Sequence, residues 1–293
     1  MRFPFTGVIP VDKPSGVTSR RVVDAVARAL GMAAVGHAGT LDPLAAGVVM
    51  VCVGHATKLV DHLHALSKHY TATFLLGRSS PSDDFETPVE EEADPPRPAR
   101  EVIEAALPAF RGDILQRPCD YSAVHVDGKR AYRLARKGRA VTLAAKPVRI
   151  ERLEITAYDW PMLGLDVICS SGTFIRAIGR DLAEHLGTRA VMAALSRTAV
   201  GPFTRAASLA LEAVDPDSVR AALLPPVSAL PGMPRVMLSG DLLERAVRGA
   251  LIDPGPDRAG VLAALDETGD LVGLLTSHAS GGWRLRPNFR GAG

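Results

Sequence analysis

The sequence predicts an α+β protein in which a mixed sheet is followed by a small, mainly β domain. Strand-like and helix-like segments alternate in irregular order, which does not fit a regular βαβ repeat. A proline-rich stretch, residues 225–234, then precedes about 60 residues with short apolar runs. At about 150 residues per domain, a chain of 293 residues also suggests two domains. We therefore expect domains at residues 1–226 and 227–293.

The first helix and strand flank a glycine-rich segment. Thr18 or Ser19 can cap a helix that Gly31 can end. The apolar residues between them recur at helical spacing: Val22, Val23, Val26, Ala27 and Leu30. Residues 36–47 contain too much glycine and proline for a regular element, and residues 48–53 form an apolar, strand-like run.

The elements that follow are predicted from apolar periodicity and from turn residues. We expect helices near residues 57–66, 102–110, 129–137 and 175–186, the third of them basic and ended by Gly138. Strands are expected at residues 70–77, 148–155 and 165–169, and an acidic, proline-rich loop at 81–98. The C-terminal part contributes short apolar runs at residues 236–238, 261–265 and 271–275.

Composition excludes several classes of protein. With 47% hydrophobic and 23% charged residues and a mean hydropathy of +0.12, the chain is neither disordered nor fibrous. The longest apolar run, Val48–Val53, is far shorter than the ~18 to 20 residues of a membrane helix. The N-terminal residues MRFPFTGVIPVDKP contain no apolar helical segment or cleavage site of a signal peptide. We therefore expect a cytoplasmic protein.

Metal and nucleotide sites are not indicated. The three cysteines, Cys52, Cys119 and Cys169, are widely spaced and form no CxxC pair, which argues against a disulfide framework or a zinc ribbon. His62 and His64 are two residues apart and point to different faces of a helix. The sequence also lacks GxGxxG, GxxxxGK[ST] and GxSxG motifs. We expect neither a metal nor a cofactor.

Charge is unevenly distributed along the chain. The net charge of +2 says little about partners, but acidic residues cluster between residues 83 and 104. Residues 125–152 contain nine lysines and arginines against Asp127 and Glu151. This basic segment predicts local binding of a polyanion; the alternative is a solvated basic helix.

Two charged residues are candidates for a site. Asp42 lies in the glycine-rich segment directly before Pro43, which favours an extended backbone at Asp42 and fixes how its carboxylate is presented. An Asx turn between helix and strand is the alternative interpretation. Arg176 lies between Ile175 and Ile178 at the start of an apolar helix, where an unpaired guanidinium would be costly. We expect a carboxylate partner for Arg176.

Six segments in order carry a resemblance to a known family. They are VDKPSGVTSRRVV (11–23), GHAGTLDPLAAGVVMVCVGHATKL (36–59), KHYTATFLLG (68–77), YSAVHVDGKRAYRLARKG (121–138), SGTFIRAIGRDLAEHLG (171–187) and LSRTAVGPF (195–203). Together they resemble the motifs of bacterial tRNA pseudouridine synthases of the TruB family, which modify uridine 55 in the TΨC loop. The resemblance covers residues 9–211, and the part from Met233 onward weakly resembles the PUA-type RNA-binding domain.

The resemblance implies a fold and a reaction. The fold would be a mixed, mainly antiparallel sheet flanked by helices, followed by a PUA-like domain. The reaction would be the isomerisation of uridine to pseudouridine after base flipping, with no cofactor or metal, by a monomer that binds the TΨC stem-loop of tRNA. Whether the aspartate attacks the sugar, attacks the base or removes a proton stays open.

The resemblance also implies roles for individual residues. Asp42 would be the catalytic aspartate and Arg176 its ion-pair partner. Tyr70 would stack on the target base, Leu195 would close over it, and His37 would fill the space that the flipped uridine leaves. Lys13 and Pro14 fall in a motif near the site and Lys13 is expected to bind substrate. Residues 117–146 resemble a thumb-like insertion whose expected RNA contacts are Lys129, Arg130, Arg133 and Arg136.

Three positions depart from the family pattern. Ala38 replaces a usual threonine, Cys119 a second proline and His125 a lysine, of which the last puts one RNA contact in doubt. Three other functions are compatible with the sequence. They are a tRNA-folding chaperone of the same fold, a protein subunit of a guide-RNA pseudouridylation particle, and, more distantly, a metal hydrolase.

Overall fold

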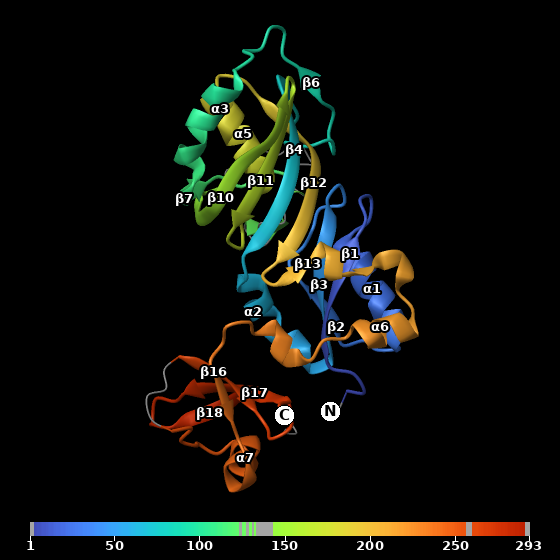
Figure 1. Ribbon diagram of the computed structural model, residues 1–293, viewed down its shortest axis with the longest axis vertical. Helices are drawn as coiled ribbons and strands as arrows, with labels where there is room; N and C mark the ends of the chain where they lie inside the picture. Colours follow the sequence, from blue (N-terminus) through green and yellow to red (C-terminus); the bar gives the residue numbers. More distant parts are fainter. Residues whose placement is uncertain are drawn as a thin grey trace.

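A mixed sheet forms the body of the molecule (Figure 1). The computed structural model describes residues 3–122, 125–126, 129–130, 132, 143–255 and 260–290. Within these residues the sheet has ten strands; eight follow the order β14-β1-β3-β12-β4-β11-β10-β7, while β2 pairs with β3 and β13 with β12. Most neighbours are antiparallel, but β14 is parallel to β1 and β12 is parallel to β3. The predicted mixed α+β fold is confirmed.

The strands of this sheet have the following bounds: β1 (Gly7–Lys13), β2 (Val35–Ala38), β3 (Ala46–Val53), β4 (Lys68–Leu76), β7 (Gly112–Gln116), β10 (Lys146–Asp159), β11 (Met162–Cys169), β12 (Ala190–Val200), β13 (Phe203–Thr204) and β14 (Leu209–Ala210). Separate short pairs are β5 (Arg78–Ser79) with β6 (Glu90–Glu91), and β8 (His125–Val126) with β9 (Lys129–Arg130). The α-helices whose bounds the structure describes are α1 (Ser19–Leu30), α2 (Val60–Ala65), α3 (Arg100–Ala106), α5 (Ile175–His185), α6 (Pro216–Ala222) and α7 (Gly240–Val247). Short 3₁₀ turns are η1 (Gly54–Leu59), η2 (Leu107–Phe110), η3 (Arg205–Ala207), η4 (Leu211–Ala213) and η5 (Pro226–Ala229).

The first helix follows the capping rules. The Thr18 hydroxyl accepts a hydrogen bond from the Arg21 amide at the start of α1, and Gly31 ends the helix in the left-handed conformation. Its apolar stripe is buried. Helices α3 and α5 cover one face of the β4–β7 half of the sheet (Figure 1), because apolar residues of both helices share one core with alternate residues of β4 such as Phe74.

The prediction of a basic helix at residues 129–137 is wrong at its start. Lys129 and Arg130 form strand β9, which pairs antiparallel with β8. In the sequence, Asp127 and Gly128 separate the two strands, and Asp-Gly is a strong hairpin signal that competes with helical periodicity. Tyr132, within the expected helix, is helical, and the other residues of that helix, 131 and 133–137, lie outside the described residues.

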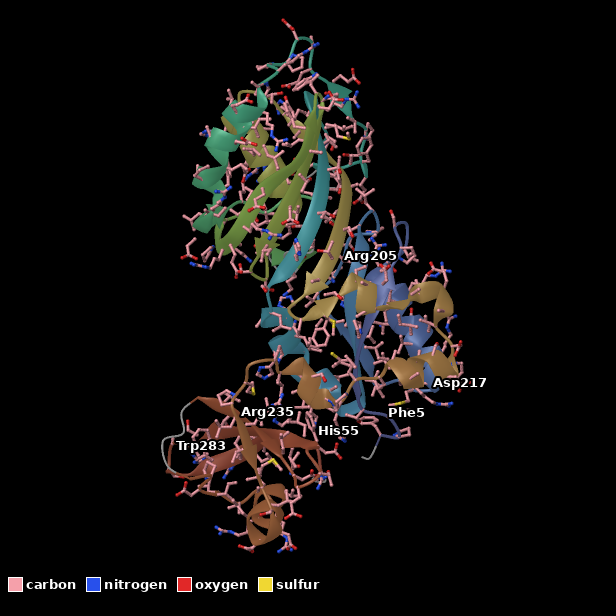
Figure 2. All side chains as sticks on the ribbon, viewed as in Figure 1. Phe5, His55, Arg205, Asp217, Arg235 and Trp283 are labelled. Atoms are coloured by element: carbon pink, nitrogen blue, oxygen red, sulfur yellow. The ribbon has the colours of Figure 1, made fainter. Side chains whose placement is uncertain are left out.

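A separate four-stranded sheet closes the chain. Its strands follow the order β15 (Arg235–Met237), β16 (Val261–Leu265), β17 (Leu271–Ser277) and β18 (Trp283–Asn288). The sequence predicted mainly β structure for this part of the chain. This sheet lies at one end of the molecule (Figure 1) and contacts η1 through a shared apolar cluster. At that contact His55, which is labelled in Figure 2, stacks on the ring of Phe289.

The two halves of the large sheet meet over a very short distance. Strand β12 pairs with β4 along nearly its whole length but with β3 at only two positions, Ser196 with Ala46 and Arg197 with Gly47. Residues on both sides of this junction form the candidate site. Among the described residues, none of the helices combines the length and the hydropathy of a transmembrane segment.

Candidate active site

Asp42 lies in an irregular loop, residues 39–45, between β2 and β3. The loop backbone is bound by side chains from β1 and from the turn and helix that follow it. The Ser19 hydroxyl accepts from the Leu41 amide at 2.8 Å and contacts the Leu41 carbonyl at 3.1 Å. The Ser15 hydroxyl donates to the Leu44 carbonyl at 2.7 Å. These bonds fix a segment that no regular element stabilises.

Lys13 binds the same loop from the end of β1. Its side chain is fully buried, and the ammonium donates to the carbonyls of Val17 (2.7 Å), Pro14 (3.0 Å), Ala45 (2.5 Å) and Pro43 (3.4 Å). Burial lowers the pKa of Lys13 to about 8, with the nearby charge of Asp42 acting in the opposite direction. Lys13 therefore holds the backbone that presents Asp42, and it is not among the residues that line the pocket described below.

Arg176 meets Asp42 from the other half of the sheet. It occupies the first turn of α5 with a side chain only 6% exposed, and its guanidinium lies 3.2 Å from an Asp42 carboxylate oxygen. A second carboxylate, Asp84, lies 3.1 Å away on the other arm of the guanidinium. The same guanidinium donates to the carbonyls of Ser82 at 2.8 Å and Tyr121 at 2.9 Å. The carboxylate partner expected for Arg176 is therefore present twice.

The charges around Arg176 keep it protonated. Burial acts to lower its pKa, but the surrounding acidic groups, Asp42 foremost, more than offset this effect and raise the pKa above its ordinary value. The two carboxylates differ in exposure: the Asp84 side chain is 4% exposed and the Asp42 side chain 43% exposed. Asp42 is thus the one that can face a substrate.

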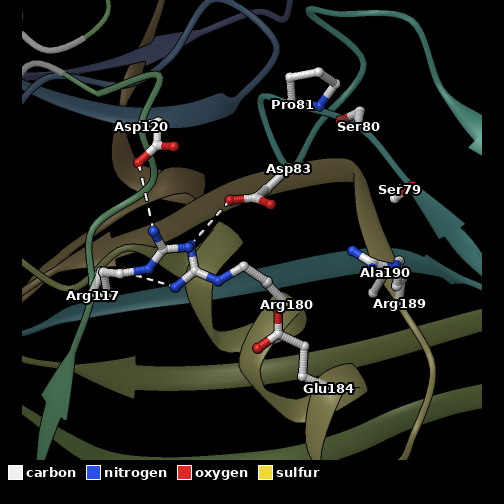
Figure 3. Close-up of a pocket in the computed structure, with 10 residues that line it drawn as sticks. All are labelled: Ser79, Ser80, Pro81, Asp83, Arg117, Asp120, Arg180, Glu184, Arg189 and Ala190. Carbon is white, nitrogen blue, oxygen red and sulfur yellow. Dashed lines mark hydrogen bonds and ion pairs between the residues drawn. The ribbon is translucent and has the colours of Figure 1, made fainter. Parts of the chain in front are cut away.

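A second ion pair lies one helical turn farther along α5. Arg180 contacts Asp83 at 3.2 Å and donates to the Arg117 carbonyl at 2.7 Å, as Figure 3 shows for the ion pair. Burial raises the pKa of Asp83, and the Arg180 guanidinium opposes that effect. Asp83 and Asp84 are adjacent in the chain, and their partners Arg180 and Arg176 lie four residues apart on the same side of α5. These two ion pairs fix the loop that presents Asp84.

A pocket of about 160 Å³ opens beside the Asp42–Arg176 pair. That volume equals roughly five water molecules at ~30 Å³ each, enough for one small ring. Tyr70 of β4 and Leu195 of β12 are among its walls, and the complete lining is Thr40, Leu41, Asp42, Tyr70, Ser122, Thr173, Phe174, Ile175, Arg176 and Leu195. Burial raises the pKa of the Tyr70 hydroxyl, so the ring stays neutral. The sequence-predicted residues Asp42, Tyr70, Arg176 and Leu195 are brought together.

The remaining predicted residues lie elsewhere. His37 is half-buried on β2 and does not line this pocket; burial, and then the charges of Arg197 and Arg20, lower its pKa. Lys129 and Arg130 lie on β9, whereas Arg133 and Arg136 lie outside the described residues. In the described part of the chain, no group of three or more potential metal ligands is found.

Sequence reasoning missed two residues of the site. Asp84 lies in the acidic loop, where nothing in the pattern distinguishes it from its neighbours. Arg197 lies in β12, two residues after Leu195, and is fully buried. An arginine within a strand that is otherwise apolar or small was an available signal, because such a charge needs partners.

Comparisons with known proteins show the family of this chain. A model of the TruB family of pseudouridylate synthases, N-terminal domain, matches residues 27–175. A tRNA pseudouridine synthase B of Mycolicibacterium paratuberculosis is 41% identical over 274 residues, or 92% of each chain. The chain belongs to the TruB family. A tRNA pseudouridine synthase B of Gluconacetobacter diazotrophicus is 38% identical over 301 residues, or 97% of each chain.

The family assignment confirms the resemblance found in the sequence and makes the protein an isomerase. A solved structure of the archaeal box H/ACA sRNP Nop10-Cbf5 complex contains a chain with the same fold. The TM-score is 0.72 at 22% identity, covering 97% of this chain and 86% of that chain. At this identity the likeness supports the fold alone, and it includes the C-terminal sheet.

Proposed function

We propose that this TruB-family protein converts uridine 55 in the TΨC loop of tRNA to pseudouridine, with Asp42 as the catalytic carboxylate. The observation that carries the proposal is the half-exposed Asp42 carboxylate, paired with a buried arginine at a pocket with Tyr70 in its wall. The names of the curated relatives support tRNA as the substrate.

The reaction requires access to one nucleotide. The N1–C1′ bond of uridine breaks, the uracil turns, and a C5–C1′ bond forms; C5 loses a proton and N1 gains one. No oxidant, reductant or energy source is consumed. A stacked base exposes neither its face nor its sugar, so the nucleotide must leave the stack, at a cost of a few kcal/mol. Stacking on Tyr70 offsets ~1 to 3 kcal/mol of that cost.

Asp42 has two chemical uses at this position. An ionised carboxylate can attack the sugar or the base as a nucleophile, and it can also accept the C5 proton. Both uses require the charged form of the carboxylate, and Arg176 places an opposite charge 3.2 Å from it. Leu195 closes the pocket from β12, and Lys13 orders the Asp42 loop rather than contacting RNA.

The other segments are assigned to RNA binding. Residues 117–146, with Lys129, Arg130, Arg133 and Arg136, would contact phosphates of the stem, and residues 227–293 would form a PUA-like RNA-binding domain after a catalytic domain of residues 1–226. His37 would fill the space in the RNA that the flipped nucleotide leaves. We propose that the enzyme acts as a monomer in the cytoplasm, where tRNA is found.

Tritium release tests the proposal. A tRNA transcript carrying C5-tritiated uridine is incubated with the purified protein alone, and modified positions are mapped afterwards. We expect one equivalent of tritium and pseudouridine at position 55, with a transcript carrying cytidine at that position as the control. Tight binding without release would favour the chaperone alternative. Activity only with an added guide RNA and its proteins would favour the particle subunit.

A further inference from the structure

Arg197 is a buried cation that the Asp42–Arg176 pair does not explain. Its side chain is fully buried, yet within the part of the chain that the structure describes no carboxylate lies at ion-pairing distance from it. Its guanidinium instead donates to three backbone carbonyls, those of Val48 at 2.7 Å, Gly39 at 3.0 Å and Thr40 at 3.5 Å. A buried charge is tolerated only where dipoles replace its water, and these carbonyls supply them.

The three carbonyls lie on both sides of Asp42 in the sequence. Gly39 and Thr40 begin the loop, and Val48 belongs to β3, which continues from the end of the loop. One planar guanidinium therefore connects the entry of the loop to the strand at its exit. Gly39 has a φ of 90°, and a Cβ there would lie 3.5 Å from the guanidinium. The entry of the loop thus lies in van der Waals contact with this side chain.

The backbone of Arg197 is also fixed at this point. Arg197 pairs with Gly47 at the short β12–β3 junction, and a Cβ on Gly47 would lie only 2.2 Å from the Arg197 carbonyl oxygen. Only glycine allows this approach of the two strands. On the other edge of β12, the pairing with β4 shifts register between Arg197 and Ala199. The residue that binds the loop therefore lies where the two halves of the sheet join.

We propose that Arg197 is a positioning residue that sets the place of the Asp42 carboxylate relative to Arg176 and the pocket. This inference rests on the proposed function, because it assigns Arg197 a part in the same reaction. Lys13 binds two carbonyls that follow Asp42 in the loop, those of Pro43 and Ala45. Arg197 binds the two that precede it, those of Gly39 and Thr40. The loop is thus bound on both sides of the reacting residue.

An arginine suits this task better than a lysine. The guanidinium donates from three nitrogens in fixed directions: Nε binds the Val48 carbonyl, and the two terminal nitrogens bind those of Gly39 and Thr40. An ammonium donates from a single nitrogen. The positive charge of Arg197 also acts on neighbouring groups. Burial is the main cause that lowers the pKa of Lys13 and of His37, and the charge of Arg197 lowers both further. Because a displacement of ~1 Å at the reacting group can reduce a rate by ~100-fold, loss of this geometry should be visible in the chemical step.

The test compares Arg197→Lys and Arg197→Met with Ile103→Ala. Ile103 is fully buried on α3 and does not line the pocket, so its truncation lowers stability without touching the loop. Each variant is measured for melting temperature, tRNA affinity, single-turnover rate at saturating tRNA, and backbone hydrogen exchange in residues 36–47. We expect Arg197→Lys to lose ~100-fold in rate, to bind tRNA within about threefold of the parent, and to exchange faster in this segment.

The outcomes distinguish a positioning role of Arg197 from a general loss of stability. They also distinguish failure of this inference from failure of the proposed function. Ile103→Ala should keep its rate and its exchange in residues 36–47 even where its melting temperature falls as far as that of Arg197→Lys. Equal rate losses in the two variants, or unchanged exchange in Arg197→Lys, would overturn the inference. If the parent itself forms no pseudouridine, the proposed function fails, and the exchange data still decide whether Arg197 holds the loop. Arg197→Lys serves alone if Arg197→Met does not fold.

Discussion

The two charged partners of the site are fixed in opposite ways. Asp42 lies in an irregular loop whose backbone is bound by Lys13, Ser19 and Arg197, while its carboxylate stays 43% exposed. Arg176 lies in a regular helix, and there it is the side chain that is bound, by two carboxylates and two carbonyls. The difference leaves one group, the Asp42 carboxylate, both ordered and accessible.

The same contrast separates the two carboxylates on Arg176. Asp42 and Asp84 lie at nearly equal distances from the guanidinium, 3.2 and 3.1 Å, but Asp84 is 4% exposed. Electrostatic attraction to Arg176 alone therefore does not distinguish them. Access to the pocket does, because Asp42 lines it and Asp84 does not.

The largest effect on turnover should come from removing the charge of Asp42, the exposed carboxylate of the two. Asp42→Asn keeps the shape of the side chain and removes the charge, so we expect a loss of about a thousandfold or more in turnover with tRNA affinity within about threefold. Asp84→Asn is the matched control, since it removes a charge from the same guanidinium. Its loss should be smaller, at most about a hundredfold. Single-turnover tritium release measures both, and near-parental activity of Asp42→Asn would refute the assignment.

Arg176 should matter most for stability. Arg176→Ala leaves the buried Asp84 carboxylate without a counter-charge, which predicts a loss of about 3 to 5 kcal/mol in the free energy of unfolding. Arg176→Lys should also be impaired, because one ammonium cannot reproduce the fork, whose two arms reach Asp42 and Asp84 separately. Arg189→Ala is the control: the arginine side chain is 62% exposed where it pairs with Glu92, and we expect a change below ~1 kcal/mol.

Urea unfolding followed by circular dichroism measures these differences. If Arg176→Ala and Arg189→Ala were equally stable, the Asp42–Arg176–Asp84 contacts would contribute nothing to the fold. Activity of Arg176→Lys at the parental level would show that the geometry of the guanidinium is unimportant.

Local signals make much of the fold predictable. The cap at Thr18 and the stop at Gly31 define α1, and the alternation from Tyr70 onward defines β4, because both depend on neighbouring residues only. The β8–β9 strand pair differs from the expected helix start, because the Asp-Gly signal in the sequence competes there with helical periodicity. Strand β12 was not predicted, although it joins the two halves of the sheet, because its pairing with β3 involves residues about 150 positions away.

The site was predictable only in part for the same reason. Burial beside Ile175 and Ile178 indicated that Arg176 needs a carboxylate, and the structure supplies Asp42 and Asp84. Which of the acidic residues between 83 and 104 would do so depends on how that loop folds onto α5. The three carbonyls bound by Arg197 leave no trace in the sequence, because every residue has a carbonyl.

Substitutions of Tyr70, in the pocket wall, should have a moderate effect on the single-turnover rate. Tyr70→Phe keeps the ring and loses the hydroxyl, whereas Tyr70→Leu loses both. Stacking is worth ~1 to 3 kcal/mol, so the Leu variant should lose up to about a hundredfold in single-turnover rate and the Phe variant less. If the Phe variant were the slower, the hydroxyl and not the ring would be the important part.

The basic segment should have the smallest effect on the chemical step. Neutralising Lys129, Arg130, Arg133 and Arg136 together should weaken tRNA binding and flatten its dependence on salt, by ~0.7 to 0.9 in the log–log slope for each phosphate that the protein no longer neutralises. Turnover at saturating tRNA should stay close to that of the parent, because Asp42 and Arg176 are ordered by contacts elsewhere.

Binding across a salt series and single-turnover rates together decide this last point. An unchanged slope would mean that these four residues are only solvated. Lys129 and Arg130 lie on a short strand and not on the expected helix, so each of the four residues is best replaced singly as well. A collapse of the saturated rate would instead show that the segment helps to extract the nucleotide, and the division between a chemical region and a binding region would then fail.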